Sequence, residues 1–529
     1  CSAASAGSRS WTASARSCSS PGRAGSTAST ASSSASAGGS RASAMKPSLR
    51  FLEDALVSRI LDEAHDLLAT LGVEVHNDAA TELLLAHGAR KDERGRILIP
   101  APVVDRALRA APHAVRLFDA LGAQTHELGG DAVYFTPGSA AIHVLDGETG
   151  RIRTPATADY VRYAKLVAGL PHIAAQSTAL IPADVPGDIQ DSFRLFLSLL
   201  LGEKPVVTGA FSAAGFEVMR DLQLAVRGTP DSLRARPLCV FSCCPTAPLA
   251  WSYETSQNVI DCARAGIPVE FVSMPLAGFV APVTLVGSVV QHAAETLSGV
   301  VLSQLASAGA PVVWGGSPAI FDIRYETTPM GAIETMMLDC ANAEVGKRLG
   351  LPTQGYIALS DAKALDAQAG LETGMGAVLA SLSGINSVSG PGMLDFESCQ
   401  SLEKLVLDDE ICGMVARLRR GIEPREDFPS RPLFEELFKE KHLLIAAHTR
   451  KHRKEQIRFA SPVIERAPLG RWREEGETTL GQRASREVAR LVAAWTPSRL
   501  PDETKRALRE RMGHAASAAG MGELPMVEA

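Results

Sequence analysis

The chain has 529 residues, of which 46% are hydrophobic and 21% charged, and its formal net charge is −6. This mild acidity argues against a nucleic-acid surface, where clustered Lys and Arg are expected. No stretch comes near the roughly 18 uncharged apolar residues of a membrane span; the best candidates, 195–201 and 283–290, are short and flanked by polar residues. Nine cysteines are too few for a disulfide scaffold, and most stand singly in apolar runs, as reduced thiols do. We therefore expect a cytoplasmic protein without nucleic-acid or membrane partners.

The first 44 residues differ in composition from everything that follows. They contain no Asp, Glu, Leu, Ile, Val or Met, and consist mostly of Ser, Ala, Gly and Arg. Such a composition cannot form a hydrophobic core. Three interpretations stay open: a transit peptide, a disordered tail, or upstream sequence read from a wrong start, with Met45 as the true beginning. We favour the third, because a transit peptide would itself begin with Met and carry an apolar face.

Residues 45–130 are expected to form a helical N-terminal segment. Phe51, Leu52, Leu56 and Ile60 recur near the 3.6-residue period of a helix. The pattern then changes around 133–146 to strand, turn and strand, with Asp-Gly as the turn signal.

From residue 157 onwards, helical segments alternate with short apolar runs. The apolar runs are continuous rather than alternating, which is typical of parallel strands buried on both faces. The predicted strands are 173–181, 205–211, 237–245, 268–275, 311–318, 352–359 and 385–392. The predicted helices are 158–168, 188–201, 213–226, 252–265, 285–308, 331–349, 364–381 and 400–420.

With one strand from 133–145 the strand count reaches eight, so the sequence predicts an α/β fold, a (β/α)8 TIM barrel over residues 131–425. A doubly wound open sheet is the alternative, weakened by the lack of a glycine-rich phosphate motif after the first strand. Residues 426–529 are charged and helical, and are expected to form a C-terminal helical extension on the outside of the barrel.

Candidate binding residues follow from the rule that such barrels bind substrates at the carboxyl ends of their strands. Trp314 and Tyr356 end two neighbouring predicted strands, and acids lie close by in the sequence. Aromatic rings with nearby acids suit a quaternary ammonium group, although ordinary loop packing explains any single ring equally well. The candidate substrate-binding residues are Ser242, Trp314, Gly315, Tyr356, Asp361 and Glu397.

Other polar residues give weaker signals. Asp361 also fits as a helix-capping acid. Glu270 is a charge inside the apolar run PVEFVSMP, and we expect it to pair with an Arg or Lys. Adjacent Cys243 and Cys244 would point to opposite sides of a strand, and the 12 His residues form no metal-binding motif, so we expect no metal.

Four stretches together resemble the trimethylamine–corrinoid methyltransferase family. They are VLDGETGRIRTPATADYVRYAKLVAGLP (144–171), AETLSGVVLSQLASAGAPVVWGG (294–316), LPTQGYIALSDAKALDAQAGLE (351–372) and EKLVLDDEICGMVARLRRGI (403–422). The resemblance covers about Met45 to residue 490, and the family shares the barrel architecture that the strand count predicts.

The resemblance implies a reaction. A methyl group leaves a methylated amine for the Co(I) corrinoid of a separate small protein, and no cofactor is bound directly by this chain. A quaternary nitrogen leaves as a neutral amine, so the site has only to hold and align the cation. Founding members use pyrrolysine, whereas every letter here is a standard amino acid. We expect the equivalent position within 355–392 and a glycine betaine-like substrate, as in relatives without pyrrolysine; the catalytic residues stay unknown.

Two other functions remain open at this stage. A barrel enzyme acting through a Schiff base would need a Lys in a strand, and the predicted strands contain none. A non-catalytic binding module for a methylated amine or a corrinoid protein fits the sequence too, because the proposed chemistry needs no signature side chain. The sequence is also compatible with a homo-oligomer.

Overall fold

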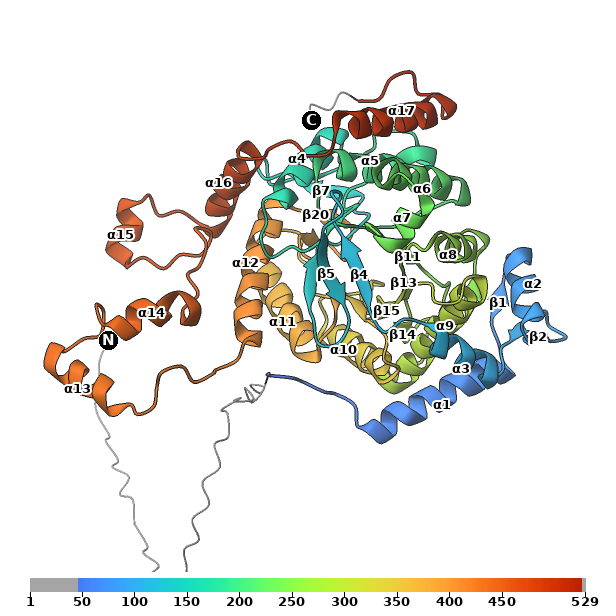
Figure 1. Cartoon of the computed structure of the whole chain (residues 1–529), viewed down its shortest axis with the longest axis horizontal. Helices are drawn as coiled ribbons and strands as arrows, with labels where there is room; N and C mark the ends of the chain where they lie inside the picture. The colour runs from blue at the N-terminus through green and yellow to red at the C-terminus, as the bar shows by residue number, and fades with distance from the viewer. Residues whose placement is uncertain (1–45, 526–529) are drawn as a thin grey trace, which may run out of the picture. The chain divides into compact units, whose positions relative to one another are not determined.

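Eight parallel strands form a closed barrel at the centre of the fold (Figure 1). The structure is a computed structural model, and it describes residues 46–525. Strands β15, β13, β11, β10 and β9 form one sheet, and β17, β18 and β6 form a second. Parallel bridges between Phe135 and Ile173 and between Trp314 and Thr353 join the two sheets at both edges. The barrel strands are β6 (Tyr134–Thr136), β9 (Gln176–Ser177), β10 (Val206–Thr208), β11 (Cys239–Cys243), β13 (Val269–Ser273), β15 (Val312–Gly316), β17 (Gln354–Tyr356) and β18 (Ser387–Ser389).

Each barrel strand is followed along the chain by a helix of the outer ring. These helices are α4 (Thr157–Ala168), α5 (Gln190–Leu201), α6 (Ala213–Arg227), α8 (Tyr253–Ala265), α9 (Leu285–Ala306), α10 (Ile333–Arg348), α11 (Ala367–Ser383) and α12 (Leu402–Arg419). The predicted (β/α)8 barrel is confirmed, and the doubly wound alternative is wrong because the sheet closes on itself. Two shorter elements, η1 (Gly187–Ile189) and α7 (Pro230–Ala235), lie in the connections.

Helix α9 departs from what we expected of the apolar stretches. By length and composition it could cross a membrane, because an 18-residue window within Leu285–Ala306 is apolar enough. However, 78% of that window is buried inside the fold, where α9 contacts α8, α10 and the N-terminal helix α1 (Asp54–Thr70). Its hydrophobicity is therefore explained by packing on all sides.

The amino end of the barrel is closed by a hairpin that we did not expect. Strands β4 (Val115–Phe118) and β5 (Gln124–Leu128) pair antiparallel within the segment predicted to be helical. Leu117 and Leu128 of this hairpin pack against Val207, Val240 and Val313 of the barrel strands. Among the described residues, apolar side chains therefore fill the interior at this end of the barrel. A ligand can enter the barrel only at the opposite end.

The rest of the N-terminal segment is helical as predicted, with short strands between the helices. Helices α1, α2 (Asp78–Ala86) and α3 (Ala101–Ala110) all pack on α9. The small strands are β1 (Glu74–Val75), β2 (Arg90–Lys91) and β3 (Ile97–Leu98), and β1 pairs with β12 (Ala250–Trp251).

Short strands also lie at the carboxyl end of the barrel. Strands β7 (His143–Leu145) and β8 (Ile152–Arg153) form the hairpin expected at Asp-Gly, and they join β19 (Met393–Leu394) and β20 (Cys399–Gln400) in one sheet. Strands β14 (Leu276–Ala277) and β16 (Ala319–Ile320) pair with each other. These pairings fix the loops that follow β6, β13, β15 and β18.

The C-terminal extension is helical, as predicted. It contains α13 (Arg431–Glu440), α14 (Ala447–Gln456), α15 (Leu469–Glu474), α16 (Leu480–Ala493) and α17 (Asp502–Ala518). Helix α16 packs on α12 and α4, and α17 packs on α5 and α6, so both lie on the outside of the barrel. The expectations for residues 1–44 lie outside the described residues.

The β4–β5 hairpin should contribute strongly to stability. Replacing the buried Leu117 with Ala removes packing against the barrel interior, and we expect it to lower the free energy of unfolding by about 2–5 kcal/mol. Arg116→Ala, at an exposed position of the same strand, is the matched control and should change it by less than about 0.5 kcal/mol. Urea unfolding followed by fluorescence measures both, and equal effects would show that the hairpin does not seal a core.

Candidate active site

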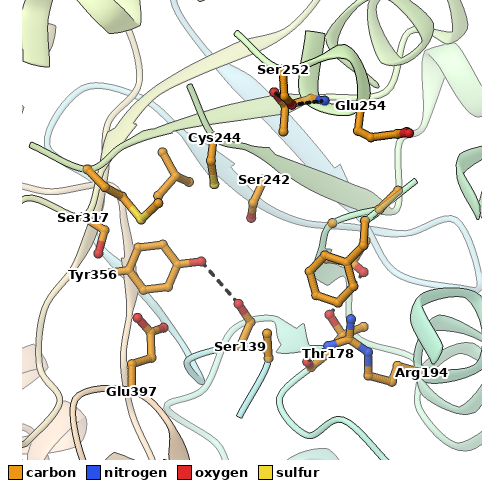
Figure 2. A pocket seen from close by; sticks show the side chains of 18 residues that line it. Ser139, Thr178, Arg194, Ser242, Cys244, Ser252, Glu254, Ser317, Tyr356 and Glu397 are labelled. Carbon is orange, nitrogen blue, oxygen red and sulfur yellow. Dashed lines mark hydrogen bonds between the residues drawn. The ribbon is translucent and has the colours of Figure 1, made fainter. Parts of the chain in front are cut away.

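A cavity of about 500 Å³ opens at the carboxyl ends of the barrel strands. It therefore lies where barrels of this kind bind their substrates. Figure 2 shows Glu397, Tyr356 and Ser317 on one side of the cavity and Arg194 and Thr178 on the other. Its other lining residues are Ser139, Ala140, Thr208, Gly209, Ala210, Phe211, Ser242, Cys244, Ser252, Glu254, Thr255, Val272 and Met274.

Glu397 reaches the cavity from a sharply bent turn between β19 and β20. Asp395, Phe396 and Glu397 have φ angles of 51°, 54° and 69°, a left-handed conformation that is costly for side chains with a Cβ. Lys363 secures this turn, because its Nζ lies 3.3 Å from a carboxylate oxygen of Asp395 and 3.7 Å from the ring centre of Phe396. Strain of this kind is typical of functional sites, and here it presents the carboxyl group to the cavity.

The Glu397 carboxyl group lacks a positively charged neighbour. Its Oε1 atom is buried without a hydrogen-bond partner, and among the described residues Glu397 forms no ion pair. Its pKa is raised to about 8, mainly by burial and to a smaller extent by the Glu270 carboxyl, while a hydrogen bond from the backbone of Ser139 opposes the rise. A Cβ at Gly138 would lie 2.3 Å from Met393 Cγ and 3.3 Å from Glu397 Oε1, so glycine at this position makes room mainly for the Met393 side chain beside the carboxyl.

Glu270 lies on β13, behind the cavity-lining residue Ser242. Its side chain is fully buried, and Oε1 accepts a hydrogen bond of 2.7 Å from the Oγ of Ser242, which lines the cavity. Oε2 has no partner. The expected pairing with Arg or Lys is wrong, because none of the ion pairs within residues 46–525 involves Glu270. Burial raises its pKa to about 7, against a smaller lowering by Ser242.

Tyr356 completes this acidic side of the cavity. Its hydroxyl lies 3.3 Å from the Oγ of Ser139, as the dashed line in Figure 2 shows. Burial, and to a lesser extent the carboxyls of Glu397 and Glu270, raise the pKa of Tyr356 well above 10, so the phenol stays neutral. The Tyr356 ring and the Glu397 carboxyl thus border one space, and the Glu270 carboxyl lies behind the lining residue Ser242, an arrangement that favours a cation.

The structure brings three of the six predicted binding residues to the cavity. Ser242, Tyr356 and Glu397 line it. Trp314, Gly315 and Asp361 do not, and each has a different structural role.

Trp314 faces the outer helices, because it alternates along β15 with the inward-facing Val313 and Gly315. Its side chain is fully buried against α10, and Nε1 donates a 2.9 Å hydrogen bond to the carbonyl of Asn342. The expectation that it forms part of a cation cage is therefore wrong. The stacked pair Phe279 and Phe321 lies outside the cavity lining as well.

Gly315 and Asp361 have structural roles in the barrel, in packing and in holding a loop. A Cβ at Gly315 would lie 2.4 Å from Gln354 Oε1, so glycine here makes room for that side chain. Asp361 accepts hydrogen bonds from the backbone N–H groups of Met330 and Gly331 at 2.9 and 2.8 Å. It therefore fastens the loop before α10, close to its alternative interpretation as a capping acid, and burial raises its pKa to about 6.

Sequence reasoning missed Arg194 and Ser139 as lining residues. Arg194 interrupts the apolar helix sequence FRLFLSLLL, just as Glu270 interrupts an apolar strand. A single charge inside a continuous apolar run was the available signal, since such a charge has to be used or compensated. Within residues 46–525, no group of three or more His, Cys, Asp or Glu side chains is arranged to hold a metal ion.

A closed (β/α)8 barrel with a cavity at the carboxyl ends of its strands, lined by Glu397, Tyr356 and Arg194, defines the class of protein: a barrel built to bind a small molecule at that end. The family described as trimethylamine methyltransferase matches residues 19–518 of the chain. The chain belongs to this family of methyltransferases, and the resemblance seen in the sequence is confirmed.

Two sequence relatives agree with this assignment. A trimethylamine methyltransferase of Methanosarcina thermophila is 31% identical over 81% of this chain and 89% of its own length. A glycine betaine methyltransferase of Desulfitobacterium hafniense (strain Y51) is 28% identical over 86% and 95%. A crystal structure of the Methanosarcina barkeri monomethylamine methyltransferase is similar at a TM-score of 0.47 and 12% identity, covering 88% of this chain and 94% of that chain.

The two unpaired carboxyls predict how stability depends on pH. Because the pKa values of Glu270 and Glu397 are raised from 4.5 to about 7 and 8, the folded chain keeps protons that the unfolded chain has lost. Stability should therefore fall as the pH rises from about 4.5 to 8. In the double variant Glu270→Gln/Glu397→Gln, stability should fall less over this pH range. Thermal unfolding at a series of pH values measures the difference. Parallel curves for the two proteins would contradict the burial of unpaired carboxyls.

Trp314 should matter for stability and not for binding. Trp314→Phe removes the hydrogen bond to Asn342 and part of the buried ring, so we expect a lower unfolding temperature. The affinity for an ammonium ligand should stay within about twofold of the unchanged protein, because the indole lies outside the cavity. Calorimetric titration measures the affinity, and thermal unfolding measures the stability. A tenfold weaker affinity in a stable variant would show that Trp314 contributes to ligand binding.

Proposed function

We propose that this protein transfers a methyl group from a quaternary or tertiary methylated ammonium compound to the Co(I) corrinoid of a separate carrier protein. The observation that carries the proposal is the Glu397 carboxyl, which lines the cavity and whose Oε1 has no hydrogen-bond partner among the described residues, together with the Glu270 carboxyl behind Ser242. Such groups are costly in a protein interior unless a cation completes the site. The names of the relatives, which act on trimethylamine and glycine betaine, support the same substrate chemistry.

The residues present explain how the cation is held. A methylated ammonium group has no strong hydrogen-bond donor once it is quaternary, so it is recognised by charge and by the face of an aromatic ring. Glu397 at the cavity wall and Glu270 behind Ser242 supply the charge, and Tyr356 supplies the ring. Binding of the cation favours the ionised carboxyls and lowers their pKa values, so protons leave as the substrate enters.

The transfer itself needs no acid or base from the protein. The carbon–nitrogen bond breaks with its electron pair remaining on nitrogen, and the Co(I) co-substrate supplies the pair for the new carbon–cobalt bond, which leaves methyl-Co(III) and a neutral amine. The protein contributes by fixing the direction of one methyl group toward the open end of the cavity. This accounts for a site made of carboxyls, hydroxyls and a ring, without a catalytic triad.

The competing functions are less well supported. A Schiff-base mechanism requires a Lys in the cavity, but no Lys lines it, and the nearby Lys363 is engaged with Asp395 and Phe396. A binding module without turnover would use the same residues, and only an assay distinguishes it from an enzyme. We also propose a cytoplasmic location, in keeping with the seven free cysteines of the described residues.

The test is methylation of Co(I) cobalamin by the purified protein with a panel of methylated amines, followed by the absorbance of methyl-cobalt. We expect turnover with at least one quaternary amine. Glu397→Gln and Glu270→Gln should each reduce kcat/KM by about tenfold or more, since each removes a charge that holds the substrate. Glu217→Gln, at an exposed position of α6, is the matched control and should be unchanged.

Three results would count against the proposal in different ways. Binding of an amine without methyl-cobalt formation would support the module instead of the enzyme. Full activity in both carboxyl variants would remove them from the site. No binding of any methylated amine would reject both functions.

A further inference from the structure

The cavity has a second charged side, opposite Glu397 and Tyr356, which the methyl transfer does not use. Arg194 lines it from α5, and Figure 2 shows the guanidinium beside Thr178, across the cavity from the carboxyl of Glu397. The Arg194 side chain is only 1% exposed. A buried guanidinium remains charged at every physiological pH, so its position in a ligand cavity needs an explanation.

Protein acceptors use only part of the guanidinium. Nε donates to the carbonyl of Gln190 at 3.3 Å, Nη1 to the carbonyl of Thr178 at 2.8 Å, and Nη2 to Oδ1 of Asp191 at 2.8 Å. An arginine has five N–H donors, so two N–H groups, one on each terminal nitrogen, stay without an acceptor among the described residues. Paired terminal N–H groups match the two oxygens of a carboxylate.

The surroundings hold the guanidinium in place. Asp191 accepts from Arg194 with one oxygen and from the backbone N–H of Phe211 with the other, at 2.5 Å. The Phe211 ring lies 5.2 Å from the guanidinium carbon. Asp191 thus ties Arg194 to the loop that begins α6 and fixes the orientation of its remaining donors.

Two acids face this side, and both are already engaged. Asp191 is paired with Arg194 itself, and burial raises its pKa while the guanidinium lowers it. Glu254 lines the cavity, and its Oε2 accepts a 2.6 Å hydrogen bond from the backbone N–H of Ala213 at the start of α6. On this side, each Arg194 nitrogen makes one hydrogen bond, and the second N–H of each terminal nitrogen has no protein acceptor within residues 46–525. On the other side of the cavity, Glu397 Oε1 has no hydrogen-bond partner.

We propose that Arg194 binds the carboxylate of a zwitterionic substrate, a trimethylammonium carboxylate, whose cationic end lies at Glu397 and Tyr356. This inference rests on the proposed function and assigns a specificity-determining residue to it. Arg194 would select substrates that carry an anion at a fixed distance from the nitrogen, and it would leave the methyl groups at the opposite side of the cavity.

The test compares two kinds of ligand by calorimetric titration at one pH. The first kind is trimethylammonium carboxylates with one, two or three methylene groups between the charges; the second is tetramethylammonium, which has the cation alone. The variant is Arg194→Gln/Asp191→Asn, which removes both buried charges together and so avoids leaving Asp191 unpaired. Arg162→Gln, on the exposed face of α4, is the control.

We expect the double variant to lose at least about tenfold in affinity for every trimethylammonium carboxylate that the unchanged protein binds. Its affinity for tetramethylammonium should stay within about twofold. A merely structural role of the Arg194–Asp191 pair would weaken both kinds of ligand by the same factor, and that result would overturn the inference. So would unchanged affinity for the carboxylates, or binding of tetramethylammonium by the unchanged protein without binding of any carboxylate.

The last two results leave the proposed function intact, because the cation is still bound. If the unchanged protein binds none of these cations, the proposed function fails, and the role of Arg194 fails with it.

Discussion

The burial of two carboxyl groups without a compensating cation is the constraint on which the rest of this structure depends. Glu270 sits in the middle of a barrel strand and Glu397 at the end of a strained turn, and neither forms an ion pair within the described residues. The pKa values of both groups are raised, since desolvation opposes their charge. The fold thus holds an unfavourable arrangement, and the proposed cationic substrate would relieve it.

The barrel tolerates this arrangement because its two ends are built differently. At the amino end, the β4–β5 hairpin and a layer of valines make a dry, well-packed core. At the carboxyl end, the inward positions carry Ser242, Tyr356 and the carboxyls instead. Packing energy from the first region and from the helix ring offsets the cost of the second. Residues two apart on one strand point to the same side, as Val240 and Ser242 do on β11, so the two environments are neighbouring layers of one barrel interior.

Most of the fold could be predicted from the sequence, because buried parallel strands and amphipathic helices leave strong periodic signals. The helix predicted over 213–226 is found at Ala213–Arg227, and that predicted over 252–265 at Tyr253–Ala265. The β4–β5 hairpin escaped prediction since its strands are short and follow a helical pattern. Its role depends on packing with residues about 50 to 200 positions away, which no local pattern reveals.

The candidate site was harder to predict, and the reason is geometric. Position at a strand end identified Tyr356 and Ser242, yet it equally suggested Trp314, whose direction depends on a one-residue alternation that the sequence does not fix. Charges inside apolar runs were more informative than aromatic residues. Glu270 stood out in this way but was expected to be paired, and Arg194 carried the same signal in a helix.

The two charged sides of the cavity also suggest how a product could leave. When the methyl group departs, the nitrogen loses its positive charge, and the attraction of Glu270 and Glu397 for that end of the molecule is lost. Because their pKa values in the free site are about 7 and 8, both carboxyls can then take up protons near neutral pH. A carboxylate at Arg194 would keep its contact throughout the transfer. Substrate and product of the proposed reaction would therefore differ in affinity at one side of the cavity only, so the change in charge at nitrogen would by itself favour exchange of product for substrate.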